Sequence, residues 1–73
     1  MNIQVLGTQV NSMKELIKFL NCALYYCEEL QIQDPITKDF HPYSSMDESE
    51  LEAITDSAKE YEFNELTVVQ QYE

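Results

Sequence analysis

Residues 46–64, MDESELEAITDSAKEYEFN, contain the start, both faces and the end of one helix. Asp47 is a favourable N-cap residue, and Glu50 follows three positions later, as in a capping box. Acidic side chains in the first turn also suit the positive end of the helix dipole. The stretch therefore predicts a helix that begins at Asp47 and ends near Phe63, with Asn64 as its C-terminal cap.

The two faces of this predicted helix differ sharply in charge. A narrow apolar stripe recurs at helical spacing and consists of Leu51, Ile54, Ala58 and Tyr61. A row of carboxylates with a spacing of four residues lies opposite the stripe and consists of Glu48, Glu52, Asp56 and Glu60. Like charges at this spacing cost a helix about 0.2–0.5 kcal/mol per pair. A helix selected for stability alone would mix the signs of its exposed charges.

A second helix is predicted from about residue 12 to about residue 30. Ser12 and Glu15 form a capping box at its start. One apolar row contains Met13, Leu16, Ile17, Leu20, Leu24 and Cys27, and a second contains Phe19, Ala23, Tyr26 and Leu30. Two apolar rows indicate either a central helix packed on two sides or an aromatic row, with Phe19 and Tyr26, that contacts another protein.

Strands are expected at both ends of the chain. Residues 2–6 alternate apolar and polar and stop at Gly7, and residues 66–72 are rich in Thr, Val and Tyr. Residues 31–45 contain both prolines and predict a connection that is partly extended. We therefore expect residues 1–73 to form a single α+β domain in β-α-α-β order. Its two helices would pack on a short antiparallel sheet formed by the chain ends.

The charge balance excludes several classes of function. The 73 residues contain 14 acidic residues and four lysines, without arginine, for a net charge of −10. Direct nucleic-acid binding needs clustered basic side chains, and so does binding to anionic membranes. No apolar run approaches the roughly 20 residues of a membrane-spanning helix. Cys22 and Cys27 are expected to be small apolar residues of a reduced, cytoplasmic protein.

The residues used in catalysis and in cofactor binding are scarce. His41 is the only histidine and has no nucleophile pattern near it, and Gly7 is the only glycine, so a glycine-rich phosphate loop is excluded. The cysteine spacing is not a zinc pattern, and the acidic residues do not follow a calcium-loop pattern. We expect a protein that is not an enzyme and that uses no cofactor and no metal.

The acidic residues are concentrated in the second half of the chain, because residues 1–33 have a net charge of −1 and residues 34–73 a net charge of −9. The acidic row has three interpretations: a solvated face that keeps the protein soluble, a negative strip that occupies a basic groove in place of phosphates, or a cation site. The candidate partner-binding residues are Glu48, Glu52, Asp56, Glu60, Asp47 and Glu50 on the acidic face, and Phe19 and Tyr26 on the aromatic row.

In its size, its charge, its acidic row and its compact layout, the chain resembles the small acidic inhibitors that phages and other mobile elements encode. These include anti-CRISPR proteins, restriction inhibitors and uracil-DNA glycosylase inhibitors. The resemblance implies a cytoplasmic protein without a cofactor. It also implies binding to a host nuclease, or to its nucleic-acid channel, in the manner of a DNA mimic.

Two alternatives remain open from the sequence. The first is a protein–protein interaction module, or a homodimer, that binds through the Phe19 and Tyr26 row and the last strand. The second is an accessory protein whose acidic part neutralises a basic partner. The first predicts association that survives high salt, whereas a DNA mimic predicts association that salt disrupts.

Overall fold

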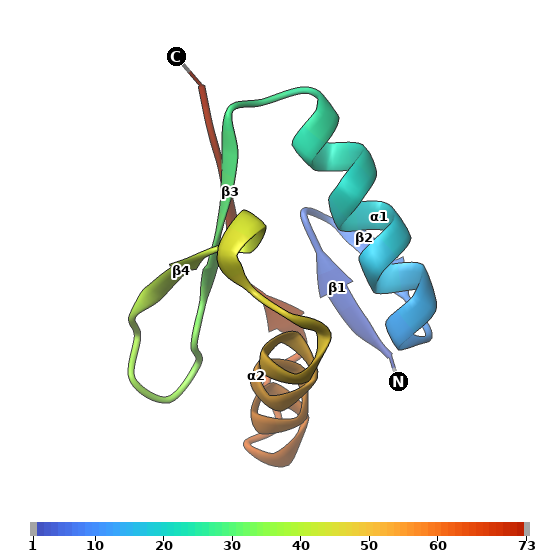
Figure 1. The fold of residues 1–73 in the computed structure, drawn as a ribbon. Helices are drawn as coiled ribbons and strands as arrows, with labels where there is room; N and C mark the ends of the chain where they lie inside the picture. The colour runs from blue at the N-terminus through green and yellow to red at the C-terminus, as the bar shows by residue number, and fades with distance from the viewer. Residues whose placement is uncertain (1, 73) are drawn as a thin grey trace.

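The computed structural model describes residues 2–72 and shows two helices and six short strands in two sheets (Figure 1). The predicted α+β class is confirmed, and the order of the elements roughly follows the prediction. In chain order the elements are β1 Ile3–Val5, β2 Thr8–Val10, α1 Met13–Tyr25, β3 Glu29–Gln33, β4 Phe40–Pro42, the 3-10 turn η1 Tyr43–Ser45, α2 Glu48–Glu60, β5 Glu65–Leu66 and β6 Val68–Gln71.

The sheet arrangement differs from the single antiparallel sheet that the sequence predicts. One sheet has the order β2-β1-β5 and the other has the order β4-β3-β6. The chain ends do meet, but β1 and β5 run parallel, with Val5 opposite Leu66. The final segment then bends at Thr67, and β6 pairs antiparallel with β3 in the other sheet. One short segment of the chain thus belongs to both sheets.

The N-terminal hairpin was not predicted. Leu6 and Gly7 have φ angles of 51° and 78° and form a two-residue turn that pairs Val5 with Thr8. Such turns need positive φ at both positions, for which Asn-Gly is the strongest signal. Leu-Gly is a weak signal, so the sequence indicated the end of the first strand at Gly7 but not the second strand that follows.

Helix α1 begins as predicted and ends early. The Glu15 N–H donates to Ser12 Oγ at 3.1 Å, and Glu15 Oε2 accepts from the Asn11 N–H at 3.0 Å. The helix ends at Tyr25 instead of near residue 30. The reason is that residues 29–33 form the central strand β3, whose hydrogen bonds to two neighbouring strands outweigh the helical periodicity.

Helix α2 also begins as predicted, with the Glu50 N–H donating to Asp47 Oδ1 at 2.8 Å. It ends three residues before Phe63 and without Asn64 as the cap. Glu62 has a φ of 61°, its N–H donates to Lys59 O at 3.1 Å, and the Phe63 N–H donates to Ala58 O at 2.8 Å. These bonds are those of a Schellman motif with Glu62 in the position that glycine usually occupies.

The expected connection at residues 31–45 consists largely of a hairpin. Strand β3 pairs with β4, and Asp34 turns the chain between them, because its Oδ1 accepts from the Ile36 N–H at 2.8 Å. Pro42 ends β4, and the 3-10 turn η1 leads into α2. The partly extended character predicted for this region is confirmed.

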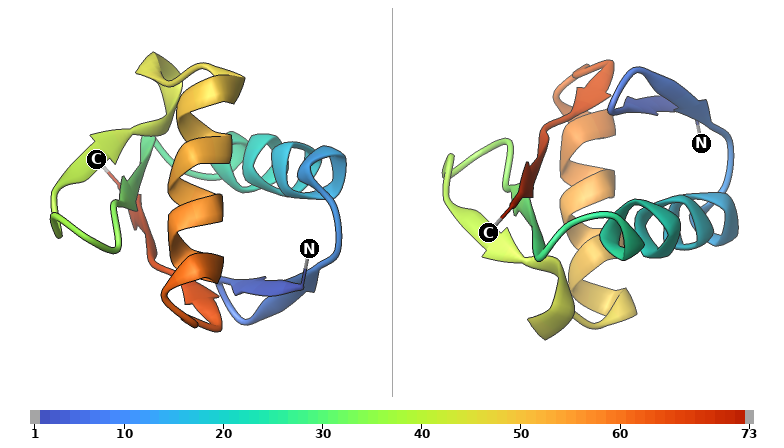
Figure 2. Two further views of the ribbon diagram at one scale, coloured as in Figure 1. Left: turned by 90° about the horizontal axis from the view of Figure 1, so that it is seen from below. Right: turned by 90° about the horizontal axis from the view of Figure 1, so that it is seen from above.

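The core lies between the two helices and the inner faces of the two sheets, as the views in Figure 2 show. Three residues of the apolar stripe predicted on α2 lie in this core, whereas the fourth, Tyr61, caps the helix and is exposed. The buried apolar residues are Ile3, Val5, Val10, Leu16, Leu20, Leu30, Ile32, Leu51, Ile54, Ala58, Leu66 and Val68. Thr55 is the polar member of this interior, and its hydroxyl donates to Leu51 O at 2.8 Å.

The positive φ at the end of α2 leads to a stability prediction. Replacing Glu62 with glycine removes the strain of an L side chain in the left-handed region, but glycine also gives the unfolded chain more conformational entropy. Because the first effect is larger, we expect the free energy of unfolding to rise by about 0.5–1 kcal/mol. Glu60→Gly is the matched control, since it removes the same charge from the last helical turn and should cost about 0.5–1 kcal/mol. Urea unfolding measures both. Equal destabilisation by the two variants would contradict the geometry at Glu62.

Candidate functional site

The acidic row on α2 is present and solvent-exposed along its whole length. Its members are the exposed residues Glu48, Glu52, Asp56 and Glu60. At 1.5 Å of rise per residue, the twelve steps from the first to the last span about 18 Å. The side of the helix that faces the core contains Leu51, Ile54, Thr55 and Ala58. The packing of the opposite face therefore fixes the helix, and with it the acidic row. The side chains of the row do not enter the core.

The two acidic residues at the start of α2 have different surroundings. Asp47 is exposed, but one of its carboxylate oxygens accepts the Glu50 N–H, so part of its role is to cap the helix. The Glu50 side chain is exposed in the first turn. Both add negative charge at this end of the row, and the exposed Glu62 and Glu65 follow the other end of α2 in the chain.

Phe19 and Tyr26 do not form one exposed row. Phe19 is partly buried and packs against the core, and Leu30 is buried in β3. Tyr26 stands just after the last residue of α1, where it caps the helix, and is 69% exposed. The predicted second apolar row is therefore not continuous on one helix, since α1 ends at Tyr25 and Leu30 lies in β3. Of its two candidate binding residues, Tyr26 alone is largely exposed.

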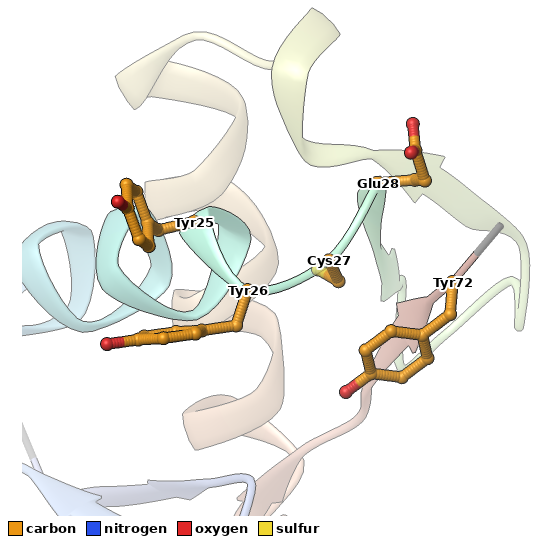
Figure 3. A pocket seen from close by; sticks show the side chains of 5 residues that line it. All are labelled: Tyr25, Tyr26, Cys27, Glu28 and Tyr72. Carbon is orange, nitrogen blue, oxygen red and sulfur yellow. The ribbon is translucent and has the colours of Figure 1, made fainter.

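Tyr26 belongs instead to a cluster of three exposed tyrosines. Tyr25 is 83% exposed and Tyr72 is 67% exposed. The rings of Tyr25 and Tyr26 meet edge to face, with their centroids 5.2 Å apart. With Cys27 and Glu28, the three tyrosines line a shallow, open pocket at the end of α1 (Figure 3). We call Tyr25, Tyr26 and Tyr72 the tyrosine cluster.

The close view limits what this pocket can bind. The rings of Tyr26 and Tyr72 flank Cys27, whereas the Glu28 carboxylate points away from them (Figure 3). The Cys27 thiol donates to the carbonyl oxygen of Ala23 at 3.4 Å, so it is engaged within the helix end. The pocket thus offers aromatic rings and hydroxyl groups for contact with a protein surface. Sequence reasoning missed Tyr72 because its neighbours in the pocket, residues 25–28, are distant from it in the sequence.

Two side chains elsewhere have displaced pKa values. The Ser44 hydroxyl donates to Glu29 and lowers the pKa of that carboxyl below 4.5, helped by the backbone N–H groups of Leu30 and Ser44. Burial raises the pKa of Tyr43 above 10.0, and its hydroxyl donates to Asn21 Oδ1 at 2.7 Å. Both pairs join η1 to neighbouring elements, and Tyr43 also lines a pocket with Asp47 and Glu48 at the start of the acidic row.

The remaining candidate residues do not gather into a site. His41 is partly buried in β4, opposite Ile32, and both cysteines are free thiols. Within residues 2–72, the His, Cys, Asp and Glu side chains form no group of three that could hold a metal ion. In the same residues, neither helix is long and apolar enough to cross a membrane.

Comparisons with protein-family models, with curated proteins and with solved structures return no match for this chain. We therefore argue its function from the chemistry of its own surfaces.

If the acidic row costs helix stability, a single lysine within it should restore part of that stability. Glu52→Lys replaces two repulsions, with Glu48 and with Asp56, by two attractions. We therefore expect the free energy of unfolding to rise by about 1 kcal/mol at low salt. In about 1 M NaCl, where screening acts beyond about 3 Å, the gain should shrink. Glu28→Lys makes the same charge change away from α2, and an equal gain there would assign the effect to net charge alone. Urea unfolding at both salt concentrations tests this.

Proposed function

We propose that this protein acts without catalysis, by binding the basic nucleic-acid site of another protein and blocking it with its acidic surface. The observation that carries the proposal is the acidic row, four exposed carboxylates in succession along one face of a helix. A helix is a rigid support, so the negative charges stay in a fixed line and need little ordering when a partner binds.

The charge density of the molecule supports this proposal. Residues 2–72 contain 13 acidic and four basic residues, for a net charge of −9 over a longest dimension of 34 Å. This charge is distributed over all sides of the molecule. Along the acidic row itself, four carboxylates span about 18 Å, one for about every 6 Å, compared with about 3.4 Å per phosphate along one DNA strand. The row therefore offers a groove a line of negative charge at roughly half the density of one strand.

The chemistry of the contact is that of carboxylates in place of phosphates. Arginine binds carboxylate and phosphate with the same two-pronged geometry, and lysine binds both as a point charge. Complementary charge also accelerates association and makes it sensitive to salt. The resemblance to small acidic phage inhibitors points to a bacterial defence nuclease as the target class, met in the cytoplasm.

The experiment is a pull-down with the tagged protein from bacterial lysate, followed by competition with the captured protein's nucleic acid. We expect capture of a nucleic-acid-binding protein at low salt and its release at high salt. Glu52→Lys/Asp56→Lys should abolish capture and competition, because it reverses the centre of the acidic row. Glu28→Lys/Asp39→Lys changes the net charge equally at exposed sites outside α2 and should retain most of the binding.

Two results contradict the proposal. Capture that is unchanged by Glu52→Lys/Asp56→Lys means that the acidic row is not the contact. Capture of a protein whose nucleic-acid binding continues in the complex means that its nucleic-acid site is not blocked. Circular dichroism of each variant, together with its urea unfolding curve, verifies that the fold is intact.

The tyrosine cluster favours a second candidate, a protein–protein interaction module. Tyrosine is enriched among the residues that dominate binding energy, and three exposed rings in one place are an unusual concentration for a chain of 73 residues. If this cluster is the contact, Tyr25→Ser/Tyr26→Ser/Tyr72→Ser should weaken partner binding about tenfold or more, and high salt should not. If binding survives the triple substitution but not the reversal of the row, this candidate is wrong.

A further inference from the structure

A small pocket opens where α1, η1 and the first turn of α2 meet. It lies along the segment drawn in yellow in Figure 1, which leads from η1 into α2. The pocket has a volume of about 240 Å³. Pockets for drug-sized molecules have volumes of about 300–1,000 Å³, so this one suits a single side chain. We call it the Met46 pocket, and its lining residues are Ile17, Tyr43, Met46, Asp47, Glu48 and Leu51.

The lining combines an apolar floor with an acidic rim. Leu51 is buried, and Ile17 and Met46 are partly buried and pack against the core. Asp47 and Glu48 are the exposed members of the lining, and both carry carboxylates. Core packing therefore fixes the floor of the pocket, whereas the charged groups stand on its solvent side.

The charge of the rim is not neutralised within the pocket. All four lysines belong to the described residues 2–72, and none of them lines the pocket. Asp47 Oδ1 accepts the Glu50 N–H at 2.8 Å, which leaves the second carboxylate oxygen for another donor. The positive end of the helix dipole is equivalent to about half a charge and offsets only part of the two negative charges. The rim is thus negative, and it joins the acidic row at Glu48.

Tyr43 adds an aromatic side chain to the wall of the pocket. Its hydroxyl donates to Asn21 Oδ1 at 2.7 Å, and this hydrogen bond to α1 fixes the position of the side chain. Guanidinium groups stack on aromatic rings and also bind carboxylates through pairs of N–H groups. A lysine ammonium is a strongly hydrated point charge and gains less from such surroundings.

We propose that the Met46 pocket binds one arginine side chain of the basic partner protein. The proposal rests on the proposed function, which supplies a partner with clustered basic residues, and it names the residue that enters the pocket. The methylene groups of the arginine contact Ile17, Met46 and Leu51. Its guanidinium donates to the carboxylates of Asp47 and Glu48.

Charge and shape select the same occupant. An apolar side chain fits the floor but leaves the two carboxylates beside it without a donor, at a cost in desolvation. An acidic side chain is repelled by the rim. Arginine carries an apolar stem and a charged head, so it satisfies the floor and the rim together. The acidic row attracts any basic groove, whereas the pocket requires an arginine at a defined position and so adds specificity.

An NMR titration of the purified protein tests the pocket without a partner. The probe is N-acetyl-arginine amide, whose side chain carries its only charge. We expect the amide signals of Met46, Glu48 and Leu51 to shift, while those of Asp56 and Glu60 at the far end of α2 remain in place. N-acetyl-norleucine amide, which lacks the charge, and an equal concentration of NaCl should produce no such shifts.

Three results of this titration would overturn the proposal. The first is the absence of shifts at the pocket, and the second is equal shifts along the whole acidic row, which indicate general attraction of a cation. The third is an equal or larger response to N-acetyl-lysine amide, which would mean that arginine is not the preferred occupant. A larger response to the arginine probe, confined to the pocket, supports the proposal.

A pair of substitutions removes the charge of the rim and keeps the helix cap. Asp47→Asn/Glu48→Gln should abolish the shifts caused by the arginine probe, and asparagine caps a helix about as well as aspartate. Glu28→Gln/Asp39→Gln is the matched control, since it removes the same charge at exposed sites outside the pocket and should retain the shifts. Shifts that persist in the first variant, or disappear in the second, would contradict the assignment to the rim.

The captured partner separates this proposal from the proposed function. Asp47→Asn/Glu48→Gln should weaken binding of the partner about tenfold, and replacing one arginine of the partner should produce the same loss. If capture depends on the acidic row but not on this variant, the pocket proposal is wrong and the proposed function stands. If the arginine probe binds the pocket but the captured protein does not bind nucleic acid, the proposed function is wrong and the pocket remains an arginine site.

Discussion

The segment from Asn64 to Gln71 joins the two sheets, and the rest of the fold depends on its hydrogen bonds. The Gln4 N–H donates to Asn64 O at 2.9 Å, and β5 then runs beside β1. After the bend, Thr67 O accepts the Gln33 N–H at 3.0 Å, and β6 continues along β3. A two-stranded hairpin is marginal alone and needs a third strand or packing against a helix, and a chain of 73 residues buries only about 60% of its unfolded surface. Because Leu66 and Val68 enter the core on either side of the bend, the same segment also closes the interior between the helices.

The features that could be predicted from the sequence are those decided by neighbouring residues. Both N-terminal caps, at Ser12 and Asp47, depend on a side chain and a backbone N–H three residues apart, so a short pattern is sufficient. The sheets depend on partner strands that are distant in the chain, and no local pattern predicts that β1 runs beside β5. The end of α1 shows the conflict directly. Helical periodicity continues to Leu30, but Leu30 pairs with Gln70 in a sheet, and tertiary pairing overrides the local preference.

The candidate surfaces also divide into those that a local sequence pattern predicts and those that it does not. The acidic row could be predicted because its residues share one helix and a spacing of four. The tyrosine cluster could not, since it unites the end of α1 with a residue that follows the last strand. The Met46 pocket was equally hidden, because its lining comes from α1, η1 and α2. The sequence left open whether Phe19 packs in the core or contacts a partner, since it reveals which residues are apolar but not which apolar row the sheets will cover.

The separation of the two faces of α2 has a consequence for how this protein can change over generations. Leu51, Ile54 and Ala58 are held by the core, whereas no residue of the acidic row contributes to it. Substitutions along the row therefore alter charge and contact chemistry without disturbing the packing that defines the domain. Such a helix can vary its outer residues under selection from a changing partner while its inner residues stay constant. Sequence change in the acidic row and sequence change in the core are thus largely independent of each other.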